Sequence, residues 1–474
     1  NKTLNMSSSR NETAATTMAL SSTKTMPKKM STTEFRQTMK DTWLTAESTF
    51  PVVNPYGNMI DMDTLLEIRE KARAPQRLIM QKIRDGEIPP PNDRLKYNLT
   101  GEIPERWPWT LNRIQSSNVN NKAVNDMLEP IIHRFVKNIQ NKTTDMPYKA
   151  YVANGFDTYV DENRFHEEVE YMKTNYLFAG VGSDCTIDSS KEVEMMGKRI
   201  LLTRDSNNNG TFQAIDKVSN TKLPSAEIAG ILFLVTHPQA GLDYEGELKE
   251  NIMNSKLRKE FETYNLQNNY AAVTQDMVIK SNWKLPIDTF GEAYHFTTLH
   301  PILSEQLVAN TIVFRGFDDN HGKPQHSCMT LGQNTLQVIA DGHVPEDRWL
   351  EPMAMSHVSM TYVLAPNTSF IVTSSGIQAT QVWPGEKVDE CVVRVTLYQG
   401  HLPENDEERA GIVTGFGGFI DVVCTEDFPI LYNMQRSFSE SKHAETIFGK
   451  HEPALIYRHG MFNTLVKGGK QAKL

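Results

Sequence analysis

The chain has few cysteines, a modest charge imbalance and no long apolar run. Four cysteines occur in 474 residues, at positions 185, 328, 391 and 424. Such wide spacing excludes a disulfide framework and is typical of a reducing compartment, so we expect a cytoplasmic protein. No run of about 18 apolar residues exists, which excludes a membrane-spanning helix. The net charge of −9 argues against nucleic acid or an anionic membrane as the main partner.

The first 40 residues are poor in acids, with only Glu12 and Glu34 among many Ser, Thr, Met and Lys residues. This composition predicts a disordered tail, and an organelle transit segment is the alternative. Residues 41–147 form a predicted helical extension. Its amphipathic patterns cover 61–84, interrupted at Pro75, and 121–140.

Short β-type runs begin after residue 148. Strands are expected at 200–204, 212–215 and 228–235, and the Asn-Asn-Asn-Gly run at 207–210 predicts a hairpin. We interpret 148–240 as a small all-β module. In 241–474 we expect helices at 248–264 and 428–440 and strands at 271–279, 311–314, 360–364, 370–373 and 391–397. This mixture predicts an α+β domain with a pocket between sheet and helix.

The stretch NWKLPIDTFGEAYHFTTLH, residues 282–300, carries the chemistry. His295 and His300 lie five residues apart, and Glu292 precedes the first by three. A gap of five is not the spacing of a regular helix, so the backbone must adjust for both imidazoles to converge. Two imidazoles and one carboxylate leave open coordination positions, as non-haem Fe(II) oxygenases require. The histidine pair alone is weak evidence for a metal site, because histidines at this spacing are more often structural.

With its neighbours, this stretch resembles the iron-binding signature of the catalytic α subunits of Rieske-type aromatic-ring-hydroxylating oxygenases. The resemblance runs from about residue 148 to the C terminus, through FDTYVDENRFH at 156–166 and FGKHEPAL at 448–455. It implies an α+β chain whose catalytic domain, residues 241–474, is a START-like helix grip with an antiparallel sheet. A degenerate small all-β Rieske-like module (148–240) and the N-terminal helical extension would precede it.

The resemblance makes His295 and His300 iron ligands and Asp427 the third, because Asp427 precedes a helix and lies eight residues before Gln435. Asp421 and Glu426 are the competing carboxylates for that third position. A carboxylate stabilised by the helix dipole is the structural alternative for Asp427.

Glu292 occupies the position of the family's bridging acid, which links an iron-bound histidine to the cluster of the neighbouring subunit. Its alternative role is to orient His295. We expect no metal ligation by the remaining histidines singled out, which lie in a loop region and in the C-terminal tail: His321, His326, His343, His451 and His459. Residues 415–418, Gly-Phe-Gly-Gly, are interpreted as a turn or a strand bend.

The family's iron–sulfur motif is missing from this sequence. Members usually hold a Rieske [2Fe–2S] cluster through Cys-x-His and, further on, Cys-x-x-His. None of the four cysteines is followed by histidine at the second or third position. After 212–215 the chain runs through DKVSNTKLP and reaches the strand at Gly230 directly, so the cluster loops look deleted. We therefore expect one mononuclear Fe(II) and no [2Fe–2S] cluster on this chain.

The resemblance implies an oxidoreductase, a non-haem Fe(II)-dependent oxygenase component that hydroxylates a small organic substrate, aromatic compounds included, with O2. Electrons would come from a cluster-bearing chain or an electron-transfer protein, within a homo- or hetero-oligomer of the trimer type. Two alternatives stay open. In the first, the chain would be a non-catalytic or regulatory subunit that binds a ligand. In the second, it would be an iron enzyme whose substrate supplies the electrons.

Overall fold

The computed structural model describes most of the chain from residue 121 onward. The described residues are 121–147, 152–206, 209–244, 252–300, 307–318, 324–351, 353–441 and 445–466, with isolated positions at 78, 81–82, 85–87 and 303. The expected tail at 1–40, most of the expected helix at 61–84, and His321 lie outside them. No helix within these ranges is both long and apolar enough to cross a membrane.

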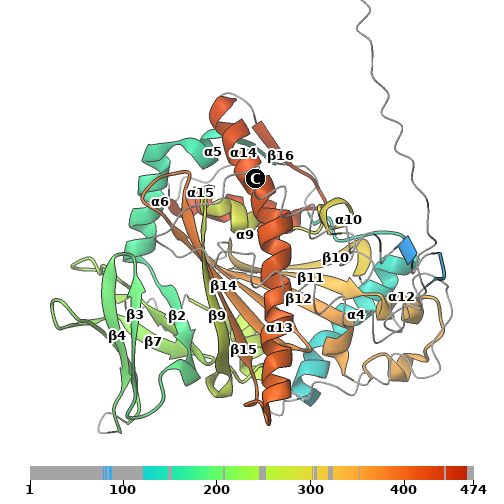
Figure 1. Cartoon of the computed structure of the whole chain (residues 1–474), viewed down its shortest axis with the longest axis horizontal. Coiled ribbons are helices and arrows are strands. Elements are labelled where there is room, and N and C mark those ends of the chain that lie inside the picture. The colour runs from blue at the N-terminus through green and yellow to red at the C-terminus, as the bar shows by residue number, and fades with distance from the viewer. Residues whose placement is uncertain are drawn as a thin grey trace, which may run out of the picture.

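The described chain is a mixed α+β structure with antiparallel sheets (Figure 1). A seven-stranded sheet with the order β10-β11-β12-β13-β14-β15-β9 forms its centre. The strands are β9 (Tyr270–Ile279), β10 (Leu307–Asp318), β11 (Pro324–Gln333), β12 (Val358–Leu364), β13 (Thr368–Thr373), β14 (Gly376–Pro384) and β15 (Cys391–Gln399). All five strands expected in this region are confirmed, whereas β11 and β14 escaped sequence analysis.

Side chains alternate between the two faces of this sheet along each strand, and helices cover both faces. On one face, Met360, Tyr362 and Phe370 share a core with α4 (Asn121–Gln140) and α8 (Ser255–Thr263). We call this the α4 face. The opposite face, here the α13 face, carries Val363 and Val382, which share a core with residues of the helices described next.

A nearly continuous rod crosses the α13 face (Figure 1). It consists of α13 (Asp406–Val422), a π-helical turn (Val423–Asp427) and α14 (Phe428–Glu440). The predicted helix at 428–440 is confirmed, and a further helix, α15 (Pro453–Val466), follows it. The interpretation of 415–418 as a turn or bend was wrong. These residues continue α13, whose Asn405 side chain caps its start by accepting from Glu408 N.

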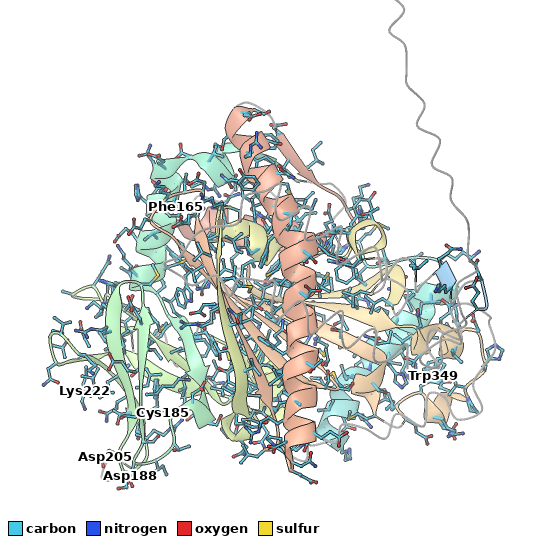
Figure 2. The ribbon with its side chains drawn as sticks, in the orientation of Figure 1. Phe165, Cys185, Asp188, Asp205, Lys222 and Trp349 are labelled. Atoms are coloured by element: carbon cyan, nitrogen blue, oxygen red, sulfur yellow. The ribbon has the colours of Figure 1, made fainter. Side chains whose placement is uncertain are left out.

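Two small sheets precede the central one, as expected for residues 148–240. They have the orders β2-β8-β7 and β3-β4-β5-β6. Their strands are β2 (Leu177–Val181), β3 (Ser190–Met195), β4 (Lys198–Arg204), β5 (Phe212–Asp216), β6 (Thr221–Leu223), β7 (Ser225–Ile228) and β8 (Ile231–Leu234). Figure 2 shows Cys185 and Lys222 in this part, far from Trp349.

The single strand expected at 228–235 is instead the hairpin β7–β8. Ala229 and Gly230 form its turn with φ values of 50° and 78°. Two successive positive φ values are typical of a tight two-residue hairpin turn. The hydrophobic run of Ile228 to Val235 concealed that turn, because alanine gives no turn signal.

Segments from both ends of the described chain pack on the central part. Strand β1 (Val152–Gly155) pairs with β16 (Glu445–Phe448), although nearly 300 residues separate them. Helices α5 (Asp157–Val160) and α6 (Glu162–Thr174) lie between β1 and β2. The 3-10 turn η1 (Gly182–Asp184) follows β2. The remaining short elements are η3 (Leu266–Asn268), α9 (Lys284–Phe290), α10 (Phe296–Leu299), α12 (Thr335–Ala340), η4 (Glu346–Arg348) and η5 (Ala354–His357).

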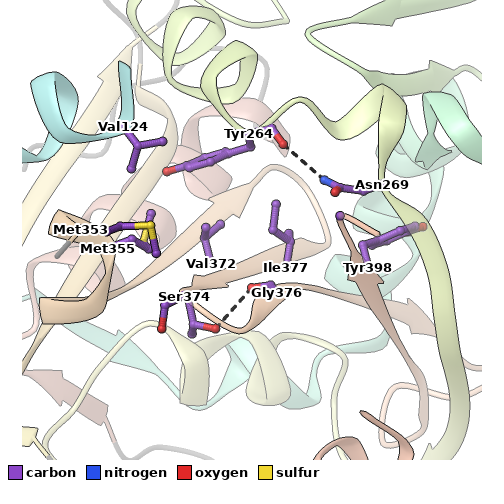
Figure 3. A pocket seen from close by; sticks show the side chains of 12 residues that line it. Val124, Tyr264, Asn269, Met353, Met355, Val372, Ser374, Gly376, Ile377 and Tyr398 are labelled. Carbon is purple, nitrogen blue, oxygen red and sulfur yellow. Dashed lines mark hydrogen bonds between the residues drawn. The ribbon is translucent and has the colours of Figure 1, made fainter. Parts of the chain in front are cut away.

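The predicted helix at 121–140 matches α4 exactly. That at 248–264 is shorter, since α8 begins at Ser255 after the Asn254 cap and residues 252–254 are not helical. A small, largely apolar pocket opens between α4, η5 and the β13–β14 turn (Figure 3). Its walls include Val124, Met353 and Ile377. It lies on the α4 face, and none of the candidate metal ligands lines it.

Candidate metal centre

The two histidines of the 282–300 stretch flank one short helix. Helix α9 ends at Phe290, a loop follows, and His295 and His300 immediately precede and follow α10. His300 leaves helical geometry, with φ −114° and ψ 65°, while its N–H still donates to Phe296 O over 2.9 Å. The backbone adjustment expected for a five-residue gap is therefore present, and both rings reach the same point.

Asp427 reaches this point through the π-helical turn that joins α13 to α14. Such a turn inserts extra backbone into a helix and often occurs at functional sites. Here it brings two successive carboxylates, those of Glu426 and Asp427, to the histidines. Pro429 lies in the first turn of α14, where a missing backbone N–H costs little.

Three atoms converge in a small triangle. His295 Nε2 and His300 Nε2 are 3.1 Å apart, and Asp427 Oδ1 lies 3.5 Å and 3.2 Å from them respectively. Neighbouring ligand atoms of an octahedral ion with bonds of about 2.1 Å are about 3 Å apart. Asp427 Oδ1 is also buried without a hydrogen bond of acceptable geometry to any described residue. An ion at the centre of the triangle would satisfy it, so the three residues fit a metal.

The outer nitrogens of both rings are bound to carboxylates. His295 Nδ1 contacts Glu292 Oε1, and His300 Nδ1 lies 2.6 Å from Glu426 Oε2. Donation from Nδ1–H leaves each Nε2 lone pair directed at the triangle. Burial lowers the pKa of His300, but the carboxylates of Asp427 and Glu426 outweigh it and raise the pKa to about 9. A metal ion must therefore displace a proton from this ring.

The competing carboxylates of the sequence take different places. Glu426 binds the outer side of His300, and Asp421 is not among the three groups that converge. Glu292 accepts from its own loop, from Tyr294 N and from His295 N, as well as contacting the His295 ring. That is the geometry of its alternative role, the orientation of His295.

The other histidines lie apart from this triangle. His326 is not in a loop but in β11, where Nε2 faces Ile252 O and Nδ1 accepts from Ala365 N. His343 follows α12, and the ring of His451 lies 4.6 Å from that of Tyr294. His459, in α15, is 3.0 Å from the Asp288 carboxylate. Sequence analysis missed this buried pair, because 171 residues separate its members.

Comparison with known proteins bears on the same region. Residues 260–468 match the family model described as ring hydroxylating alpha subunit (catalytic domain). This is narrower than the resemblance drawn from about residue 148. No curated protein sequence matches the chain.

Several solved structures are similar. The quaternary ammonium Rieske monooxygenase CntA, in complex with an inhibitor, is 12% identical, with 65% of this chain and 94% of that chain covered and a TM-score of 0.49. A naphthalene 1,2-dioxygenase variant bound to phenanthrene is 13% identical, with 66% and 92% covered and a TM-score of 0.44. The terminal oxygenase of carbazole 1,9a-dioxygenase from Novosphingobium sp. KA1 is 11% identical, with 66% and 98% covered and a TM-score of 0.37.

The family signature at 282–300 and the candidate ligand Asp427 both fall inside the segment that matches the family model. Over residues 260–468, this chain thus resembles the catalytic domain of ring-hydroxylating α subunits.

Proposed function

We propose that this chain is a non-haem Fe(II)-dependent oxygenase component that hydroxylates a small organic substrate with O2. His295, His300 and Asp427 are the proposed iron ligands. The observation that carries the proposal is the convergence of two Nε2 atoms and one carboxylate oxygen within 3.5 Å of one another. Two imidazoles and one carboxylate are the facial set of non-haem iron oxygenases, and they leave positions for O2 and substrate.

Iron bound there would supply the activation of O2, and the chain's own residues prepare the site. Glu292 and Glu426 each hold one ring by its Nδ1 atom, which fixes the tautomer and the direction of Nε2. Asp427 supplies the negative ligand from a buried position, 4% exposed. Burial excludes bulk water from this side of the site, which strengthens electrostatic contacts with a bound cation.

The proposal includes a finer description of the domains. The central sheet with the α13–α14 rod across it corresponds to the START-like helix grip, within residues 241–474. The two small sheets correspond to a Rieske-like module, residues 148–240, that has lost its cluster loops. The proposed extension, expected from the sequence at 41–147, is represented among the described residues mainly by helix α4, which packs against the central sheet.

Electrons would reach the iron from a cluster-bearing chain or an electron-transfer protein in a mixed oligomer. The sequence supports this division, because none of its cysteines belongs to a Cys-x-His or Cys-x-x-His motif. Their positions are also spread over the fold, in the small β module, in β11, in β15 and in the π-helical turn. Glu292, 13% exposed at its side chain, is the proposed link between His295 and such a partner.

Oxygen uptake by the Fe(II)-loaded chain tests this function. We expect slow uptake alone and at least tenfold faster uptake after addition of a reduced Rieske ferredoxin and an organic substrate panel. The variant His295→Ala should lose the stimulated rate. Uptake that His295→Ala leaves unchanged would contradict the proposal and favour a regulatory, ligand-binding subunit. Fast uptake without the ferredoxin would favour electrons from the substrate.

A further inference from the structure

The end of α9 nearest the metal centre is held by a buried set of side chains, which we call the α9 clamp: Asp288, Tyr159, Arg458 and His459. Tyr159 donates its hydroxyl to Asp288 Oδ2 over 3.0 Å, and His459 Nε2 lies 3.0 Å from both carboxylate oxygens. Arg458 forms an ion pair with Asp288 Oδ1. All four are at most 8% exposed. Elements α5, α9 and α15, far apart in sequence, therefore meet at one carboxylate.

The charge of Asp288 makes this meeting point specific. Burial raises its pKa, but His459 and Arg458 outweigh that effect and lower it, so the carboxyl group is ionised. A buried carboxylate that loses its partners is strongly destabilising. The side chain therefore has one favourable position, and α9 is fixed with it.

The clamp connects directly to the metal-binding loop. Gly291 N donates to Asp288 O over 2.8 Å and so ends α9. A Cβ on Gly291 would lie 2.8 Å from Leu455 Cδ2, so α15 also packs tightly on the start of the loop. Glu292 follows at once, and it binds both the ring and the backbone N–H of His295.

We propose that Asp288 is a positioning residue for the iron site, acting through α9 and Glu292 on the orientation of His295. This inference rests on the proposed function, because it concerns the ring that would bind the metal. Asp288 itself touches the clamp and not the converging ligand atoms. Its effect should therefore be on metal affinity and ring orientation, beyond its effect on stability.

The other end of α9 offers a matched control. Glu168 is 0% exposed and accepts from Trp283 Nε1 over 3.0 Å. It also pairs with Lys284 and Arg164. Glu168 is thus a buried, ion-paired carboxylate of α6 that holds the start of α9 through Lys284. Lys284 lies eight positions before Glu292, whereas Asp288 lies four positions before it. Loss of Glu168 should weaken the fold without turning His295.

The variants Asp288→Asn and Glu168→Gln should be compared with the unmodified chain. We expect Asp288→Asn to weaken Fe(II) binding roughly tenfold or more, as loss of support around metal ligands does. It should also change the electron paramagnetic resonance spectrum of the iron–nitrosyl adduct. Glu168→Gln should leave both readouts within about twofold of the unmodified chain while lowering stability to urea by a similar amount.

Equal changes in the two variants would overturn the inference, because global destabilisation would explain them. An unchanged affinity and spectrum in Asp288→Asn would overturn it too. Nitrogen NMR of isotopically labelled histidine in the metal-free chain provides a separate readout. There, loss of the Nδ1–H tautomer of His295 in Asp288→Asn would support the inference. This readout does not require iron, so failure of the unmodified chain to bind iron would contradict the proposed function alone.

Discussion

At the residue scale, the spacing of residues in the sequence predicts part of the candidate metal centre, and only the fold shows the rest. The 282–300 stretch contains both histidines and Glu292, so sequence analysis could name them together. Asp427 was named only through the family resemblance, with Asp421 and Glu426 as competitors. The role of Glu426 on His300 was not predicted, because 126 residues separate the two and the π-helical turn that joins them is invisible in a hydrophobic pattern.

Glu426 should act on metal affinity through His300. Replacement by leucine removes the acceptor for Nδ1–H, whereas replacement by glutamine keeps an amide oxygen there. We expect Glu426→Leu to weaken Fe(II) binding about 10- to 100-fold and Glu426→Gln to have a smaller effect. Competition with a chromophoric chelator measures both affinities. Equal affinities in the two variants and the unmodified chain would contradict the role assigned to Glu426.

His326 should make stability depend on pH. Burial lowers its pKa to about 4, so the folded chain keeps the ring neutral while the unfolded chain protonates it below about pH 6.5. The stability that it contributes above that pH is lost as pH falls toward 4. Between about pH 7 and about pH 5, urea titrations of His326→Gln should show a loss about 2 kcal/mol smaller than in the unmodified chain. His343→Gln, at an exposed position, is the control. An equal loss of stability between these pH values in His326→Gln and in His343→Gln would count against this account.

At the element scale, a strong apolar periodicity was sufficient to predict a helix, whereas glycine residues misled the prediction. The helices at 121–140 and 428–440 were predicted close to their observed bounds, and both carry a clear apolar stripe. Helix α13 was missed, because it has four glycines, Gly411, Gly415, Gly417 and Gly418, and a weak stripe. The β7–β8 turn was missed for the opposite reason, as its Ala229 and Gly230 lie inside an apolar run.

The same substitution should therefore have opposite effects at two glycines. A Cβ on Gly417 in α13 would meet no heavy atom within 4 Å, so Gly417→Ala should stabilise the fold by about 0.5–1 kcal/mol. Gly230 has φ +78°, and its Cβ would lie 2.7 Å from Gln267 N, so Gly230→Ala should destabilise by about 1–3 kcal/mol. Thermal and urea unfolding measure both. Destabilisation by Gly417→Ala would argue against α13.

At the scale of the whole molecule, helix α4 and the central sheet are joined by a common core. Helix α4 carries Phe135, which is fully buried with Leu128 and shares a cluster with Met360 and Tyr362 of the central sheet. Sequence analysis predicted the helix but not where it packs, because an apolar stripe does not identify its partner. Likewise, nothing in 152–155 indicates pairing with 445–448.

This shared core predicts a large effect at α4. We expect Phe135→Ala to destabilise the fold by about 3–5 kcal/mol, since it leaves a cavity beside the sheet. Lys137→Ala, on the exposed side of the same helix, should change stability by less than about 0.5 kcal/mol. Urea unfolding followed by circular dichroism checks the pair. A small effect of Phe135→Ala would indicate that α4 folds apart from the central sheet.

The central claim is that His295, His300 and Asp427 hold one iron, and metal analysis of the anaerobically Fe(II)-loaded chain tests it most directly. We predict roughly one iron per chain in the unmodified protein, and near-complete loss in His300→Ala and Asp427→Ala while circular dichroism still reports a folded chain. Iron retained at full stoichiometry in both variants, or absent from the unmodified chain, would contradict the claim.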